Sequence, residues 1–78
     1  MIQENDLVAL LTDLPTVSLI RGDVGTIAHV YQSGIRYEVE FVNAKGDTIA
    51  VETLTSDQIK KVDESRAILH YMDVERAA

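Results

Sequence analysis

The sequence predicts a small, mostly β domain in which five short antiparallel strands curl into a barrel. Three runs rich in β-branched and aromatic residues occupy the middle of the chain, at positions 24–31, 35–42 and 48–54. Short glycine-containing segments, 32–34 and 43–47, separate them, a spacing typical of an antiparallel meander. With 78 residues and no cysteine, the chain has room for one modest core that no disulfide supports.

The first strand is expected within residues 6–12, whose apolar run fits a buried strand or the start of a helix. Pro15 favours the strand, because a proline ring clashes with the preceding helical turn. Residues 13–23 then form a long irregular loop. Its apolar side chains should fold back onto the core, and they are Leu14, Val17, Leu19 and Ile20.

Two glycines introduce the second strand. Gly22 and Gly25 bracket its start, where a tight turn would use their tolerance of positive φ angles. Further along this strand, Ile27 and Val30 stand three residues apart, which breaks strict alternation. We therefore expect a β-bulge near residues 28–29.

The third strand alternates cleanly between apolar and charged residues, as expected for a strand with one face on the core. The apolar members, expected to face inward, are Tyr37, Val39 and Phe41. The charged members, expected to face solvent, are Arg36, Glu38 and Glu40. In the fourth strand the same reasoning predicts that Ile49 and Val51 point inward and that Glu52 points outward.

A single helical turn and a fifth strand complete the expected barrel. Residues 55–58 read Thr-Ser-Asp-Gln and resemble a capping box, a hydroxyl at the cap with a glutamine three residues later. Only residues 59–62 follow before the next acidic pair, so one turn and one short strand fit there. A long first loop and a single turn before the last of five strands are typical of an SH3-like barrel.

The chain divides into this barrel, residues 1–62, and a tail, residues 63–78. The acidic start and basic end of the tail suit a helix dipole, and Ile68, Leu69 and Met72 would share one helical face. Residues 68–72 also fit an additional strand. Because the tail carries several apolar side chains, we expect it to pack on the barrel or on a second copy of the chain.

Charge and the N-terminal sequence limit the possible partners. Thirteen acidic and seven basic residues give a net charge of −6, so general affinity for phosphate backbones is not expected. The N-terminus lacks a basic region followed by a long apolar run, and the apolar residues 7–11 are too few to span a bilayer. These features predict a soluble cytoplasmic protein without membrane association.

No catalytic, cofactor or metal site is predicted. His29 should approach Glu38 or Glu40 on the neighbouring strand, but a surface ion pair is favoured over a metal half-site or an acid–base pair. The serines lie outside any nucleophile-elbow sequence, and residues 22–26 lack the ending of a phosphate loop. The sequence therefore favours a binding module over an enzyme.

Two sets of residues are candidate contacts. The set proposed for a partner protein combines acidic strand residues with aromatic and apolar positions: Tyr31, Glu38, Glu40, Glu52, Ile68, Tyr71 and Met72. The set proposed for nucleic acid consists of the main bases of the barrel: Arg36, Lys45, Lys60 and Lys61. Acidic residues along the same sheet would oppose phosphate binding, so the first set is preferred.

Four segments follow one another in a distinctive order: LVALLTDLP, LxxGDVGTIxHVY, YEVEFV and GDTIAVxTL. In this order they resemble a bacterial family known as domain of unknown function 4926, over about residues 6–62. The resemblance implies a small stand-alone bacterial barrel and carries over no catalytic residue. The glycines beside the second strand are also similar to KOW-type barrels of transcription and ribosomal proteins, although fold does not imply function.

The expected function is therefore a non-enzymatic, cytoplasmic protein-interaction module. It would dock its acidic sheet face or its apolar tail onto another protein, and an antitoxin- or immunity-like neutraliser is one form that such a module takes. Homodimerisation through residues 63–78 is a variant of the same hypothesis. The alternative is a KOW-like accessory barrel associated with nucleic acid.

Overall fold

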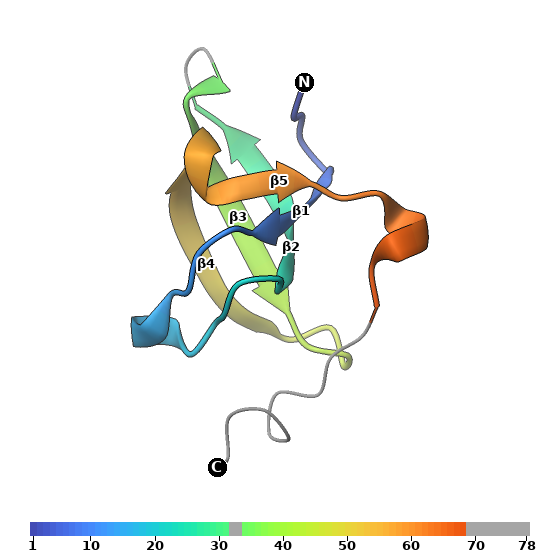
Figure 1. Cartoon of the computed structure of the whole chain (residues 1–78). Coiled ribbons are helices and arrows are strands. Elements are labelled where there is room, and N and C mark those ends of the chain that lie inside the picture. Colours follow the sequence, from blue (N-terminus) through green and yellow to red (C-terminus); the bar gives the residue numbers. More distant parts are fainter. Residues whose placement is uncertain (32–33, 69–78) are drawn as a thin grey trace.

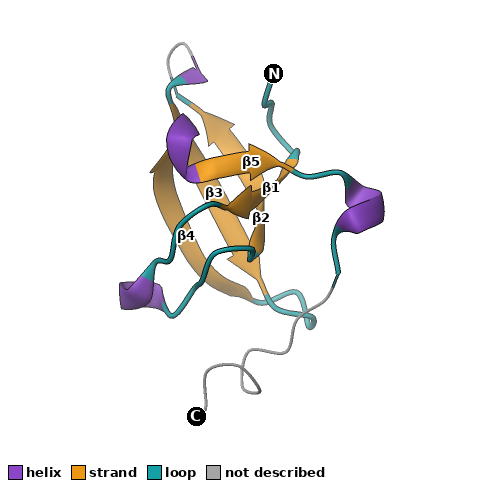
Figure 2. Cartoon of the chain, viewed as in Figure 1, coloured by secondary structure: helices purple, strands orange, loops and turns teal. Residues whose placement is uncertain are grey.

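Five antiparallel strands form one curled sheet in the order β4-β3-β2-β1-β5 (Figure 1). The computed structural model describes residues 1–31 and 34–68. The strands are β1 (Leu7–Leu10), β2 (Val24–Val30), β3 (Arg36–Val42), β4 (Thr48–Thr55) and β5 (Ile59–Lys61). Single 3-10 turns include η1 (Pro15–Val17) and η3 (Ser56–Gln58), which lie between strands, and η4 (Glu64–Arg66), which follows β5 (Figure 2). The predicted mostly β, SH3-like class is confirmed, with a sheet that is curled but not closed.

The core lies inside the curl and is centred on the alternation of β3. Tyr37, Val39 and Phe41 are buried, while the residues between them are exposed or half-buried, as predicted. Val39 faces Ile27 of β2 across the ladder, and both side chains are completely buried. The remaining buried hydrophobic residues are Val8, Leu10, Leu19, Leu54 and Ile59.

The long first loop folds back onto this core, as predicted. Leu19 is buried, and Leu14 and Val17 pack against the core. A bridge between Leu14 and Leu19 closes the loop, in which the N–H of Leu14 donates to the carbonyl of Leu19 at 2.8 Å. The turn η1 starts at Pro15, where the fixed φ of proline suits the first helical position.

The two glycines at the start of β2 have different roles. Gly22 has the expected positive φ, +94°, in the turn that precedes the strand. Gly25 does not have a positive φ, so the expectation of a turn glycine there is wrong. A Cβ at Gly25 would lie 2.7 Å from Cγ1 of Val39, so glycine permits β2 to approach β3 closely. The predicted bulge is confirmed by a register shift between Ile27 and His29.

The facing predicted for β4 is wrong. Ile49 and Val51 are exposed, with 39% and 47% of their surface accessible, whereas Leu54 is buried. Leu54 pairs with Tyr37, so residues 50, 52 and 54 share the core face and Val51 lies on the opposite face. A register shift between Phe41 and Val42 adds one extra residue to β4 near the hairpin, so that Thr48 pairs with Val42 and lies on the outer face.

The capping box and the short fifth strand predicted at the end of the barrel are both present. The N–H of Thr55 donates to Oε1 of Gln58 at 2.9 Å, which confirms the capping box before η3 and β5. In the tail, Asp63 caps η4 by accepting from the N–H of Ser65 at 3.0 Å. Residues 63–68 are all exposed. The helix or strand predicted further along the tail lies outside the described residues.

Replacing Gly25 by alanine should destabilise the fold by about 1–3 kcal/mol, because the added methyl group overlaps Val39, Phe41 and the Glu40 carbonyl. Urea unfolding followed by circular dichroism measures the change. Lys45→Ala, in an exposed turn, is the control and should alter the free energy of unfolding little. A Gly25→Ala variant as stable as the control would contradict the close approach of β2 and β3.

Candidate functional site

The strongest candidate site is the outer face of strands β2, β3 and β4, which points away from the core. Antiparallel partners share a face, so the register defines rows of side chains across it. One row is Thr26, Glu40 and Val51, and the next is His29, Glu38 and Thr53. We call this surface the outer glutamate face; it comprises Thr26, His29, Glu38, Glu40, Thr48, Val51 and Thr53, with Arg36 and Val42 at the two ends of β3 on the same side.

Two threonines of β4 fix the two glutamates of β3. The hydroxyl of Thr53 donates to Oε1 of Glu38 at 2.6 Å, and the hydroxyl of Thr48 donates to Oε2 of Glu40 at 2.5 Å. Such bonds to an ionised acceptor are stronger than bonds between neutral groups. Both glutamates are half-buried, and within residues 1–31 and 34–68 no second hydrogen bond to either carboxylate is found. Each therefore keeps an oxygen that can accept from a partner.

His29 lies at the margin of this face and pairs with a residue that the sequence did not suggest. Its Nδ1 is 3.6 Å from Oε2 of Glu4, while Glu38 is its partner in the ladder. The ring of Tyr31 contacts the imidazole edge-on, with centroids 4.7 Å apart. In the described part of the chain, no group of three histidine or acidic side chains could hold a metal ion.

The residues predicted to bind a partner do not form one surface. Glu38 and Glu40 lie together, but Glu52 pairs with Val39 and so belongs to the other face of the sheet. Tyr31 is partly exposed beyond the end of β2, and Ile68 is exposed in the tail. Two further predicted contacts, Tyr71 and Met72, lie outside the described residues.

Sequence reasoning missed an apolar strip beside the glutamates. Val42, Ile49 and Val51 are all more than a third exposed, and Val51 pairs directly with Glu40. Leu54 carried a signal for this strip. If Leu54 faces the core, alternation places residues 52 and 50 on the same face and Val51 on the outer face. The prediction that Ile49 and Val51 face the core was preferred instead.

The bases predicted to contact nucleic acid are dispersed and partly neutralised. Arg36 begins β3, Lys45 lies in the β3–β4 turn, and Lys60 and Lys61 are on β5. Nζ of Lys45 is 3.9 Å from Asp47, and Nζ of Lys61 is 3.5 Å from Asp6. These positions do not bring the four side chains together as a continuous cationic stripe.

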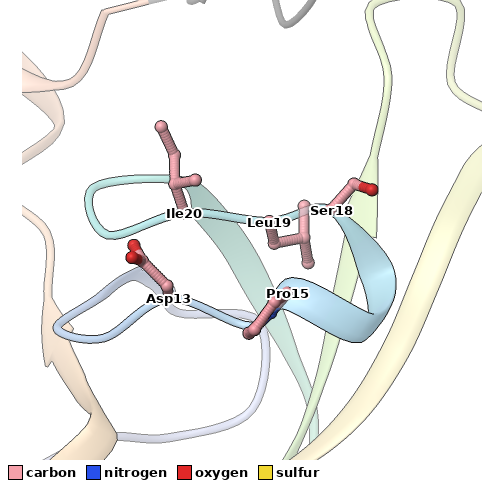
Figure 3. A pocket seen from close by; sticks show the side chains of 5 residues that line it. All are labelled: Asp13, Pro15, Ser18, Leu19 and Ile20. Atoms are coloured by element: carbon pink, nitrogen blue, oxygen red, sulfur yellow. The ribbon is translucent and has the colours of Figure 1, made fainter. Parts of the chain in front are cut away.

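A shallow depression of about 270 Å³ lies in the first loop (Figure 3). Its lining residues are Asp13, Pro15, Ser18, Leu19 and Ile20. The only carboxylate among them, Asp13, accepts the N–H of Arg21 at 2.8 Å, which closes the loop. The depression is thus a structural feature of the loop, and none of its lining residues belongs to the outer glutamate face.

These features define a small, open, SH3-like barrel with an ordered acidic face. The family model described as "Domain of unknown function (DUF4926)" matches residues 4–61, nearly the whole barrel, and the chain belongs to this family. No curated protein and no solved structure matches the chain. Within the described residues, the structure contains no helix of the length and apolar character needed to cross a membrane.

The carboxylate of Asp6 should make the stability of the fold depend on pH in the acid range. The N–H of Gln3, which donates to Oδ2 of Asp6 at 2.8 Å, lowers the pKa of Asp6, and Lys61 lowers it further. A depressed folded-state pKa gives stability above the unfolded value, about 4, and this is lost as the pH falls through the folded value. Wild type should therefore exceed Asp6→Asn in stability near neutral pH and lose that advantage in acid.

Urea unfolding of both proteins over a pH series measures this difference. The companion variant is Lys61→Met. It removes only the weaker of the two groups that lower the pKa of Asp6, so its stability should retain part of the acid dependence. A stability difference between wild type and Asp6→Asn that is the same at every pH would contradict the assignment.

Proposed function

We propose that this protein is a non-enzymatic interaction module that binds a basic partner protein through the outer glutamate face. The observation that carries the proposal is the pair of threonine hydroxyls that hold Glu38 and Glu40 in place. Ordered carboxylates lose less conformational entropy on binding than free ones. They would therefore receive a lysine or arginine at lower cost than ordinary surface glutamates.

The spacing of the two glutamates suits a repeated cation. Alternate residues of a strand stand about 7 Å apart, so Glu38 and Glu40 offer two acceptors at that interval. Lysine or arginine side chains on alternate positions of an extended segment have the same interval. A guanidinium is the better match, because its planar fork can bind a carboxylate with two hydrogen bonds.

Charge and apolar contact would act together in this interface. The net charge of −6 favours encounter with a basic protein and increases the association rate at low salt. Beside the glutamates, Val42 is exposed and supplies apolar surface of the kind found at interface centres. The cations would meet Glu38 and Glu40 while an apolar side chain covers Val42.

A small acidic protein of this kind would act in the cytoplasm as an antitoxin- or immunity-like neutraliser of a basic protein. The non-enzymatic part of the proposal is supported by the position of the glutamates on an open sheet face. A catalytic pair needs a pocket that excludes water. Asp13 is the only carboxylate residue that lines the depression in the first loop, and its carboxylate already accepts the N–H of Arg21.

Replacing both glutamates should abolish capture of the partner. The tagged protein, incubated with a lysate of its native host at low salt, is expected to retain a basic protein, and Glu38→Gln with Glu40→Gln should reduce this retention at least about 100-fold, on the order of tenfold for each charge contact. Quantitative mass spectrometry of the bound fraction measures the loss.

The control for this experiment is a double variant with the same change in net charge, Asp47→Asn with Glu64→Gln, whose carboxylates lie in exposed connections. It should retain the partner. Equal loss from both double variants would mean that total charge alone, and not the outer glutamate face, governs binding. Retention of nucleic acid with a steep salt dependence would instead favour the KOW-like alternative.

A further inference from the structure

Within residues 1–31 and 34–68, the sheet ends at β4 on one side and at β5 on the other, and the two edge strands are protected very differently. Edge strands expose unpaired main-chain groups, which proteins usually protect by short length, lysine or proline. The β5 edge is protected by short length and by lysine, since it spans only three residues, Ile59–Lys61, and two of them are lysines. The β4 edge, Thr48–Thr55, spans eight residues without lysine or proline. In Figure 1, β4 lies at the margin of the sheet with no described strand beyond it.

The side chains along β4 favour contact with another strand. Val51 and Ile49 are exposed, and the only charged residue of the strand is Glu52. On the adjoining strand, Val42 pairs with Thr48 and is 48% exposed. An apolar strip thus runs beside an unprotected edge, which is a combination that natural sheets avoid unless the edge is paired.

The register identifies the main-chain groups that this edge offers. The N–H of Ser56 donates to the carbonyl of Ile35 at 3.2 Å, and hydrogen-bonded pairs alternate along an antiparallel ladder. Residues 50, 52 and 54 therefore bond toward β3, whereas residues 51, 53 and 55 direct their N–H and carbonyl groups toward the free edge. The N–H of Thr55 is already used by Gln58. Val51 and Thr53 supply the available donors.

We propose that a second copy of this chain pairs with β4, antiparallel and with the two-fold axis at Val51. In this register the two Val51 residues face each other, Thr53 lies opposite Ile49, and Glu52 lies opposite Ala50 of the second copy. An axis at Glu52 would place two carboxylates directly opposite each other, which is destabilising. An axis at Thr53 would require the N–H of Thr55. Of the three registers centred on Val51, Glu52 and Thr53, only the one at Val51 avoids both conflicts.

Pairing of this kind joins two five-stranded sheets into one continuous sheet. The outer glutamate faces of both copies then lie on the same side, on either side of the covered Val51 residues. The pairing uses neither Glu38 nor Glu40, so it stands or falls independently of the proposed binding of a basic protein. Because the buried surface is small, we expect a reversible dimer that dissociates on dilution.

Cysteine cross-linking tests the register directly, since the chain contains no cysteine. In the proposed dimer the two Val51 Cα atoms are about 5.5 Å apart, within disulfide range, whereas the two Thr53 Cα atoms are about 13 Å apart or more. Val51→Cys should therefore form a covalent dimer at least about tenfold faster than Thr53→Cys under the same mild oxidation. Non-reducing electrophoresis over time measures both rates.

Sedimentation of the full wild-type chain provides the second measurement. Its mass should rise from one chain toward two with concentration, and Val51→Lys should remain a single chain while keeping its circular dichroism spectrum. A wild-type chain that is monomeric throughout, or equal cross-linking at positions 51 and 53, would overturn the proposal. So would monomers with slowly exchanging Val51 and Thr53 amides, since residues 69–78 of the same chain would then cover the edge.

Discussion

The alternation of buried and exposed residues along β3 is the constraint on which the other features depend. β3 lies between β2 and β4, and its side chains Tyr37, Val39 and Phe41 fill the centre of the core. A slip of one residue would move all three into water, at a cost of about 1.5–3 kcal/mol for each. Because this parity is fixed, Glu38 and Glu40 must point outward. Gly25 completes the arrangement by allowing β2 close enough to cover Val39 and Phe41.

The register between β4 and β3 determines which side chains surround the two glutamates on the outer face. Pairing Leu54 with Tyr37 places Thr53 where its hydroxyl reaches Glu38, and the register shift between Phe41 and Val42 brings Thr48, of the opposite parity, within reach of Glu40. The same register removes Glu52 from the acidic face and exposes Val51 beside the free edge. The register of β4, together with its shift near the hairpin, therefore produces both an ordered pair of carboxylates and an apolar edge. The two proposed interactions occupy adjacent surfaces and use different residues.

Features that depend on local sequence were predictable, and features that depend on tertiary contacts were not. The strands, the bulge after Ile27, and the capping box of Thr55 and Gln58 are local patterns, and all are confirmed. The facing of β4 failed because apolar residues occur at both parities of that strand, so periodicity alone could not choose between Val51 and Leu54. For Gly25, the determining contacts come from another strand. The partner of His29 was also missed, since Glu4 lies far away in sequence.

Both proposed surfaces depend on the pairing register between β3 and β4, and this register can be measured directly by NMR. In an antiparallel ladder the Cα atoms of non-hydrogen-bonded pairs approach to about 4.5 Å, and their Hα atoms give strong nuclear Overhauser effects. The structure predicts such effects between Glu38 and Thr53 and between Glu40 and Val51. A strong Hα–Hα effect linking Glu40 to Ala50 or to Glu52 would mean that β4 is displaced by one residue. Val51 would then face the core, and both proposed surfaces would lose their basis.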